Sequence, residues 1–293
     1  MIIFFGVCQP RFFSLSNAIS MLCQGSILMI LSLGVCVVTV AGGIDLSVGA
    51  VMTFSGMIMA WLLVNTSVPI AFILLATLLV GIAFGMLNGV FVSKMRIPSF
   101  IATLGTQGIA LGLSLGMNKG YTISGLPPAI GYFGNGTFLA LPIPIWLAVG
   151  AFLVTFVLLR FTPFGVYAYA IGGNEDALAL AGKPSWLFKI FTFGYAGLMS
   201  GLAAIVVTAR SMAAQPTVGV GMEFEAFSAA VLGGVFAGRG GAGETVLGVL
   251  FILILRNGLN VVGVPTYYQL AIIGMTLIVG MALSMVLERR LRR

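Results

Sequence analysis

Long apolar runs alternate with short polar or glycine-rich segments along the whole chain. An α-helix rises about 1.5 Å per residue, so about 20 apolar residues suffice to cross the hydrocarbon core of a membrane. The pattern therefore predicts an all-α fold, a polytopic transmembrane helical bundle with about nine to ten spans. The candidate spans are residues 18–40, 46–64, 70–92, 98–117, 145–160, 187–209, 225–238, 244–262 and 267–288.

Composition narrows the class of protein in the same direction. Hydrophobic residues make up 60% of the chain and charged residues only 7%. A soluble domain has roughly a quarter charged residues, so this chain could not cover a globular surface with polar groups. The net charge of +7 is concentrated near predicted membrane ends. It therefore indicates topology, and a nucleic-acid partner is not expected.

Basic residues orient the spans, because Lys and Arg are retained in cytoplasmic loops. Under one alternation, Lys94, Arg96, the segment 160–189 and the Arg-rich tail 289–293 all lie inside. The chain is therefore expected to cross the membrane several times and to end in the cytoplasm. The segments expected outside are residues 65–69, 118–144, 210–224 and 263–266, with Lys119 and Arg210 as basic exceptions.

The start of the chain does not fit this alternation by itself. Residues 9–17 fall outside, so an earlier span should lead there from the cytoplasm. Residues 1–8 are apolar but far too short to cross a membrane. We expect either a tenth helix that is truncated here or a native start that differs from residue 1.

One polar island stands between two long apolar runs, on the face predicted to be cytoplasmic. Asparagine followed by two acids and an Ala/Leu run predicts a capped helix of about two turns. A short exposed helix between spans is typical of a docking element for a soluble partner; the alternative is a loop that happens to be helical. The residues expected to carry this role are Gly172, Gly173, Asn174, Glu175, Asp176 and Gly182.

Glycines and acids interrupt the apolar pattern at two places. Gly42, Gly43 and Asp45 precede the span 46–64, and Glu223 precedes the short span 225–238. Non-helical backbone at membrane depth is tolerated only where protein or a water-filled cavity covers it. Both places are therefore predicted to be broken helices. The glycine-rich residues 238–243 lack the Lys-Ser/Thr of a phosphate loop, which argues against a nucleotide site there.

The two interruptions predict an inverted repeat, the arrangement that many transporters use to form two exchangeable faces. One domain over residues 1–293 would consist of a first half at 18–117, a connecting span at 145–160 and a second half at 187–288. Chance recurrence of short strings is the alternative. The recurring features are Asp45 and Glu223, Asn88-Gly89 and Asn257-Gly258, and Pro98 and Pro265.

No group of residues supports catalysis. The chain has no His, which removes the commonest general base and metal ligand. No catalytic, cofactor-binding or metal-ligating residue is expected. Amides and acids near the breaks suit the passage of a polar solute, with helix packing or helix capping as the competing roles. The candidates for a translocation path or gate are Asp45, Asn88, Gln107, Glu223, Asn257 and Asn260.

Several uncommon strings occur in an order that resembles a known family. They are Gly42-Gly43-Ile44-Asp45-Leu46-Ser47-Val48-Gly49, Pro98-Ser99-Phe100-Ile101-Ala102-Thr103-Leu104, Gly172-Gly173-Asn174-Glu175, Ala214-Gln215-Pro216-Thr217, and Asn257-Gly258-Leu259-Asn260 with Tyr267-Tyr268-Gln269. From about residue 10 to 288 the chain resembles the permease subunits of ribose-type sugar ABC importers.

This resemblance implies a membrane-spanning permease subunit that moves a sugar or sugar-like solute across the bacterial inner membrane. It implies ten helices per subunit, a second permease subunit, two ATP-binding subunits that hydrolyse ATP, and a periplasmic or extracellular solute-binding protein. No cofactor is expected in this chain itself. The segment 172–183 is similar to the cytoplasmic coupling helix that docks in a groove of the ATPase. Relatives often carry Arg where this chain has Val166 and Ala179, which leaves homodimer and heterodimer both open.

Two other transport classes stay open at this point. An ion-coupled secondary transporter would also have broken helices, although its acids should lie inside spans. The permeases of branched-chain amino-acid ABC importers are the nearest group within the ABC class, but the string Gly42–Ser47 favours the sugar group. The sequence does not identify the solute itself.

Overall fold

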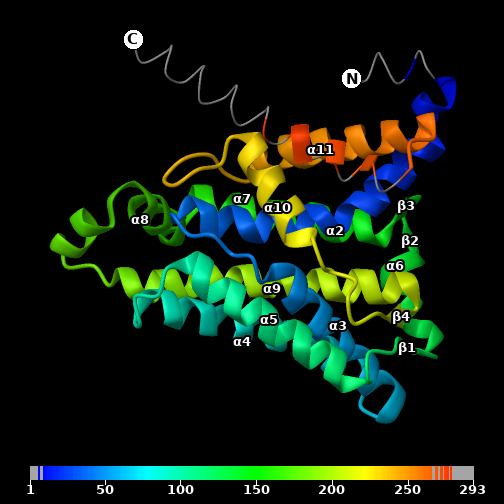
Figure 1. Ribbon diagram of the computed structural model, residues 1–293, viewed down its shortest axis with the longest axis horizontal. Coiled ribbons are helices and arrows are strands. Elements are labelled where there is room, and N and C mark those ends of the chain that lie inside the picture. Colours follow the sequence, from blue (N-terminus) through cyan, green and yellow to red (C-terminus); the bar gives the residue numbers. More distant parts are fainter. Residues whose placement is uncertain are drawn as a thin grey trace.

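Helices dominate the computed structural model shown in Figure 1, as the apolar runs predict. The structure describes residues 6, 9–265, 268, 269, 271, 272, 274–276 and 278. The helices are α2 (Leu15–Val40), α3 (Val48–Asn65), α4 (Ile70–Ser93), α5 (Ser99–Met117), α6 (Gly131–Asn135), α7 (Ile143–Phe161), α8 (Pro163–Leu180), α9 (Ser185–Ser211), α10 (Met222–Gly233) and α11 (Ala242–Val262). Short 3-10 helices and strands accompany them: η1 (Pro10–Phe13), η2 (Pro128–Ile130), β1 (Ile123–Ser124), β2 (Thr137–Phe138), β3 (Leu141–Pro142) and β4 (Ala213–Ala214).

Seven of the described helices are long and apolar enough to cross a membrane. They are α2, α3, α4, α5, α7, α9 and α11, and each matches a predicted span to within a few residues. The predicted class, a polytopic transmembrane helical bundle, is therefore confirmed. The first residues, most of the span predicted at 267–288 and the Arg-rich tail lie outside the described residues.

The span predicted at 225–238 is wrong. The helix there, α10, has 12 residues, so it is about 18 Å long, against a hydrocarbon core of about 30 Å. Gly234 takes a left-handed conformation (φ 107°) and ends the helix. Even the predicted run of 14 residues is short for a crossing, and the glycine terminates the helix earlier still. This element is a half-helix.

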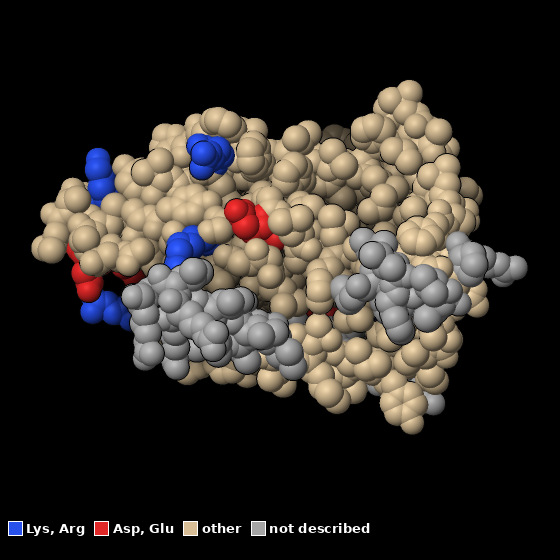
Figure 2. All heavy atoms as spheres, turned by 90° about the horizontal axis from the view of Figure 1, so that it is seen from above, with Lys and Arg blue, Asp and Glu red and all other residues tan. Residues whose placement is uncertain are grey.

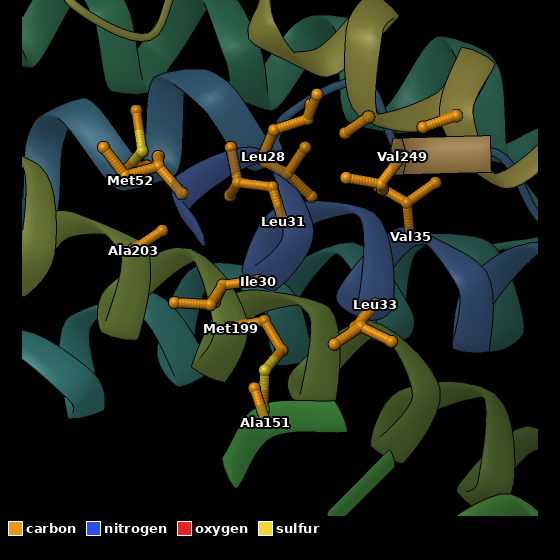
Figure 3. Packing of buried hydrophobic residues seen from close by; sticks show 14 of the residues in the cluster. Leu28, Ile30, Leu31, Leu33, Val35, Met52, Ala151, Met199, Ala203 and Val249 are labelled. Atoms are coloured by element: carbon orange, nitrogen blue, oxygen red, sulfur yellow. The ribbon is translucent and has the colours of Figure 1, made fainter. Parts of the chain in front are cut away.

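Helix α2 forms the centre of the bundle. Its residues from Ser26 to Val40 are buried except Met29, which agrees with a helix that is apolar on all sides. It packs against α7, α9, α10 and α11. In Figure 3, α2 leucines and isoleucine point toward residues of other helices, among them Met199 and Ala203 of α9 and Val249 of α11.

Glycines let α4 and α9 touch backbone to backbone. A Cβ on Gly81 would lie 2.2 Å from the carbonyl oxygen of Gly197, and one on Gly85 would lie 2.2 Å from that of Phe193. Small residues spaced by four allow this close approach between helices in a membrane. The contact ties the first half of the chain to the second, because α4 and α9 belong to different halves.

The ends of the bundle gather the loops that the charge pattern assigned to opposite sides. At one end β1 pairs with β4, with Ile123 opposite Ala214. This pairing joins the segments 118–144 and 210–224, both predicted outside. The opposite end holds α8. Figure 2 shows the molecule from above, and most of the charged atoms visible in that view lie toward the end with α8. The grouping of loops is thus consistent with the predicted alternation.

Candidate functional site

The first break separates α2 from α3. The amides of Gly42 and Gly43 donate to the carbonyl oxygens of Thr39 and Val38, each at 2.9 Å. With Gly42 at a φ of 77°, these bonds form a Schellman motif, which closes the end of α2. The chain then continues without helical structure until Val48. The glycines therefore produce the predicted broken helix.

Asp45 lies in this break and is 1% exposed. Its Oδ1 accepts from the amide of Ser47 at 2.8 Å and from the Ser47 hydroxyl at 2.6 Å. The Ser47 Oγ in turn accepts from the Asn88 Nδ2 at 2.8 Å, and the Asn88 Oδ1 accepts from the Thr106 hydroxyl at 2.7 Å. Read from the donor end, Thr106 donates to Asn88, Asn88 donates to Ser47, and Ser47 donates to the carboxylate of Asp45. The break is thereby fixed to α4 and α5.

Backbone groups of the same break find partners on α5. The amide of Ile44 donates to the Ser99 hydroxyl at 3.1 Å, and the amide of Leu46 donates to the Thr103 hydroxyl at 3.2 Å. Buried backbone amides without a partner are costly. The first turn of α5 thus supplies the protein cover that non-helical backbone needs at membrane depth.

The second break precedes α10, and it carries Glu223. This side chain is also 1% exposed. Its Oε1 accepts from the Gln107 Nε2 at 2.7 Å and from the amide of Gly221 at 3.2 Å. Within the described part of the chain, the Oε2 atom has no hydrogen-bond partner. It faces the first turn of α3, because a Cβ on Gly49 would lie 2.4 Å from it.

The two breaks meet where α3 and α10 begin. The amide of Gly219 donates to the Thr53 hydroxyl at 3.0 Å. A Cβ on Gly219 would lie 2.1 Å from the carbonyl oxygen of Gly49. From this meeting point α3 leads toward β1 and β4, while α10 leads toward the loop before α11 (Figure 1). The helices α3 and α10 thus begin close together and lead away in different directions.

We call Asp45 and Glu223, with their hydrogen-bond partners Ser47, Asn88, Thr106 and Gln107, the acidic centre. Two predicted path residues, Asn257 and Asn260, lie apart from it. Asn257 and Asn17 exchange side-chain hydrogen bonds at 2.9 and 3.0 Å. Asn260 Oδ1 accepts from the Gln269 Nε2 at 2.7 Å. Both line another cavity, of about 510 Å³, whose walls also include Arg210 and Arg256. The structure therefore brings together four of the six predicted path residues.

The polar island begins a second helix inside α8. Asn174 leaves the helical conformation (φ −162°, ψ 97°), and its Oδ1 accepts from the amide of Ala177 at 3.0 Å. This is the bond of an N-cap, so the predicted cap is confirmed. At the other end Gly182 (φ 72°) and Lys183 close the helix in a Schellman motif. We call residues 172–183 the island helix.

A polar cavity of about 850 Å³ is lined by residues of both the island helix and the first break. Its walls include Gly42 and Gly43 of the break, Arg96, and Glu175 of the island. Glu175 forms an ion pair with Lys189 of α9. Lys94 places its Nζ 4.1 Å from the ring centre of Trp186, which holds the ends of α4 and α9 together. Charged residues therefore surround the cavity at the end predicted to be cytoplasmic.

Sequence reasoning did not find several residues of this site. Ser47 and Thr106 complete the hydrogen bonds of the acidic centre, and Thr53 bonds the amide of Gly219, but a hydroxyl in an apolar run has no signature of its own. Lys189 entered the sequence analysis only as part of the basic segment 160–189, and not as the partner of Glu175. Among the described residues, no group of three His, Cys, Asp or Glu side chains could hold a metal ion.

Comparison with known proteins adds the family. A family model described as "Branched-chain amino acid transport system / permease component" matches residues 17–281. The chain is 39% identical to the ribose import permease protein RbsC of Bacillus subtilis over 97% of its own length and 89% of that protein. It is 32% identical to the D-allose transport system permease protein AlsC of Escherichia coli over 97% and 88% of the two chains. It is 34% identical to the L-arabinose permease protein AraH of Azospirillum brasilense over 92% and 80%. No solved structure matches the chain.

Proposed function

The chain belongs to this family of ABC-importer permeases, and on that premise we propose that it carries a sugar or a sugar-like solute into the cytoplasm. It would be the membrane-spanning subunit of an ATP-driven importer in the bacterial inner membrane. The observation that carries the proposal is the similarity, over nearly the whole of each chain, to permeases named for ribose, allose and arabinose.

The same similarity argues against the other transport classes. The three relatives are named for sugars, although the family model is described by amino-acid transport. An ion-coupled mechanism has no relative among these proteins. The sugar importer is therefore the function that the comparisons favour.

The partners follow from the two ends of the bundle. A capped, exposed island helix with an ion pair to α9 supports docking of an ATP-binding subunit, which would hydrolyse the ATP. The end with β1 and β4 would face a solute-binding protein. A second permease subunit, identical or different, would complete the importer, with membrane lipid around it. ATP would then bind to the partner subunit and not to this chain.

Reconstitution tests this function directly. The permease, its ATP-binding subunit and its solute-binding protein are placed in lipid vesicles, and uptake of labelled ribose, allose, arabinose and leucine is measured with and without ATP. We expect ATP-dependent uptake of one sugar and none of leucine. Uptake that persists without ATP but collapses with an ionophore would contradict the proposal, and so would uptake of leucine alone.

A further inference from the structure

Three segments of backbone meet at Gly172, where α8 approaches its kink. A Cβ on Gly172 would lie 2.0 Å from the carbonyl oxygen of Val40 and 2.4 Å from the amide nitrogen of Gly238. Real Cβ atoms do not approach backbone atoms this closely, and backbone cannot swing aside as a side chain can. Any side chain at this position would therefore collide with the backbone of Val40 and Gly238, so the packing requires glycine here.

The other two segments are bonded to each other at the same point. The amide of Gly238 donates to the carbonyl oxygen of Val40 at 2.8 Å. Gly238 has a φ of 71°, and a Cβ on it would lie 3.0 Å from the amide nitrogen of Gly173. We call Gly172, Gly238 and the Val40 carbonyl the glycine junction. It joins three chain segments that are far apart in the sequence.

Each arm of the glycine junction leads to a different functional element. Gly172 lies two residues before Asn174, which caps the island helix. Val40 is the last residue of α2, and the chain runs from it into the break that holds Asp45. Gly238 lies in the connection between α10, which carries Glu223 in its first turn, and α11. A displacement of the island helix would therefore reach the first break through the end of α2 and the second break through α10.

We propose that the glycine junction moves as one unit and transmits motion of the island helix to both broken helices during transport. Gly172 would then be a positioning residue, because it touches neither the solute nor ATP. The proposal rests on the proposed function, in which the island helix docks an ATP-binding subunit. Beyond that function, the proposal names the residues of this chain that would transmit the motion. It also states that both breaks would move together.

A matched pair of substitutions tests the contact. Gly172→Ala forces a Cβ into the backbone of Val40 and Gly238, whereas Gly243, in the first turn of α11, has open space where its Cβ would be. Gly243→Ala therefore controls for replacing a helical glycine near the same end. Both changes raise helix propensity by a similar amount, about 1 kcal/mol.

The readouts separate assembly from coupling. We expect Gly172→Ala to copurify with the ATP-binding subunit yet to lose at least tenfold of its uptake, with an ATPase rate that no longer follows the loaded solute-binding protein. Gly243→Ala should match the wild type in all three measurements. Equal behaviour of the two variants would overturn the proposal. A wild-type complex that fails to import any sugar would instead contradict the proposed function.

A disulfide tests the claim that the junction moves as one unit. A Cβ on Gly42 would lie 3.8 Å from the Cβ of Ala237, which is close to the mean separation in disulfides. Gly42→Cys with Ala237→Cys, in a background without the native cysteines, should crosslink on oxidation. Because a side chain at Gly42 (φ 77°) is itself strained, the comparison is made within this variant, and its uptake should stay within twofold of that of the same protein after reduction. Failure to crosslink, or loss of uptake on oxidation, would overturn the proposal, and this test stands even if Gly172→Ala does not assemble.

Discussion

The two broken helices place carboxylates in similar surroundings but bond them differently. Asp45 and Glu223 are both 1% exposed, and each lies where a helix begins. Asp45 Oδ1 accepts two bonds from Ser47, whose own partners lie in the first half of the chain. Glu223 in the second half accepts from Gln107 in the first half. The bonds of Asp45 therefore stay within the first half of the chain, whereas the bond of Glu223 connects the two halves.

The two breaks thus share a local arrangement, a buried acid where a helix begins, without sharing a polar network. Burial of a carboxylate in a membrane protein is costly, and such groups usually serve function. Asp45 recovers part of this cost through a relay of donors. Glu223 keeps one oxygen without a partner among the described residues. Glu223 thus keeps an oxygen that could accept a further bond, whereas the hydrogen bonds of Asp45 tie it to its own half.

The largest effect is expected from Asp45. Asp45→Ala removes the acceptor of the Ser47 amide and hydroxyl, at a cost of about 1–3 kcal/mol for each buried donor left unpaired, so the yield of assembled complex should fall sharply. Asp45→Asn keeps an acceptor oxygen but removes the charge. We expect it to assemble normally and to import at least tenfold more slowly, with weak ATPase stimulation by the loaded binding protein. Near wild-type uptake by Asp45→Asn would leave Asp45 with a structural role only.

The next effect concerns the island helix, which lies across a cavity from the first break. Glu175→Lys would set two ammonium groups against each other, because Glu175 pairs with Lys189. Gly173→Pro would rigidify the residue before the cap. Both should uncouple ATP hydrolysis from uptake while the subunit stays inserted in the membrane. Glu175→Gln serves as the milder control, since it removes the pair without repulsion. Unchanged ATPase stimulation in Glu175→Lys would contradict the coupling role.

A smaller, several-fold effect is expected from the bond that joins the halves. Glu223→Gln keeps an acceptor for Gln107 and should fold, but uptake should fall about three- to tenfold. Gln107→Leu should lower the melting temperature of the complex in the wild-type background. It should lower it less in a Glu223→Met background, where the acceptor is already absent, because neighbours that bond are not additive. Strict additivity of the two substitutions would show that the bond does not couple the halves.

The last prediction changes no activity and tests which side of the membrane each end of the bundle faces. In a chain free of native cysteines, an impermeant thiol reagent should label Thr137→Cys in intact cells. Ser185→Cys, near the island helix, should react only after the membrane is opened. Labelling of both from outside would show that the alternation built on Lys94, Arg160 and the Arg-rich tail is wrong.

The acidic centre illustrates why the site could be predicted only in part. Asp45 and Glu223 stand out in sequence because an acid in an apolar run is rare. Asn88 and Gln107 could be selected as amides, but nothing in sequence indicated that Asn88 bonds to Ser47 or that Gln107 reaches Glu223. Such partners come from helices distant in the chain. Asn257 was expected to correspond to Asn88, yet it pairs with Asn17 of α2, a partner that the sequence did not indicate.

Local chemistry by itself determined the class, most spans, the cap at Asn174 and the positions of the two breaks. These features depend on hydrophobicity summed over about 20 residues and on the conformations open to glycine and asparagine, which neighbouring residues largely set. Only the tertiary structure decided that α10 is a half-helix, that Glu223 bonds across the halves, and that Gly172 contacts Val40 and Gly238. Those outcomes depend on which backbones lie within a few ångströms of each other, and that is fixed when the helices pack.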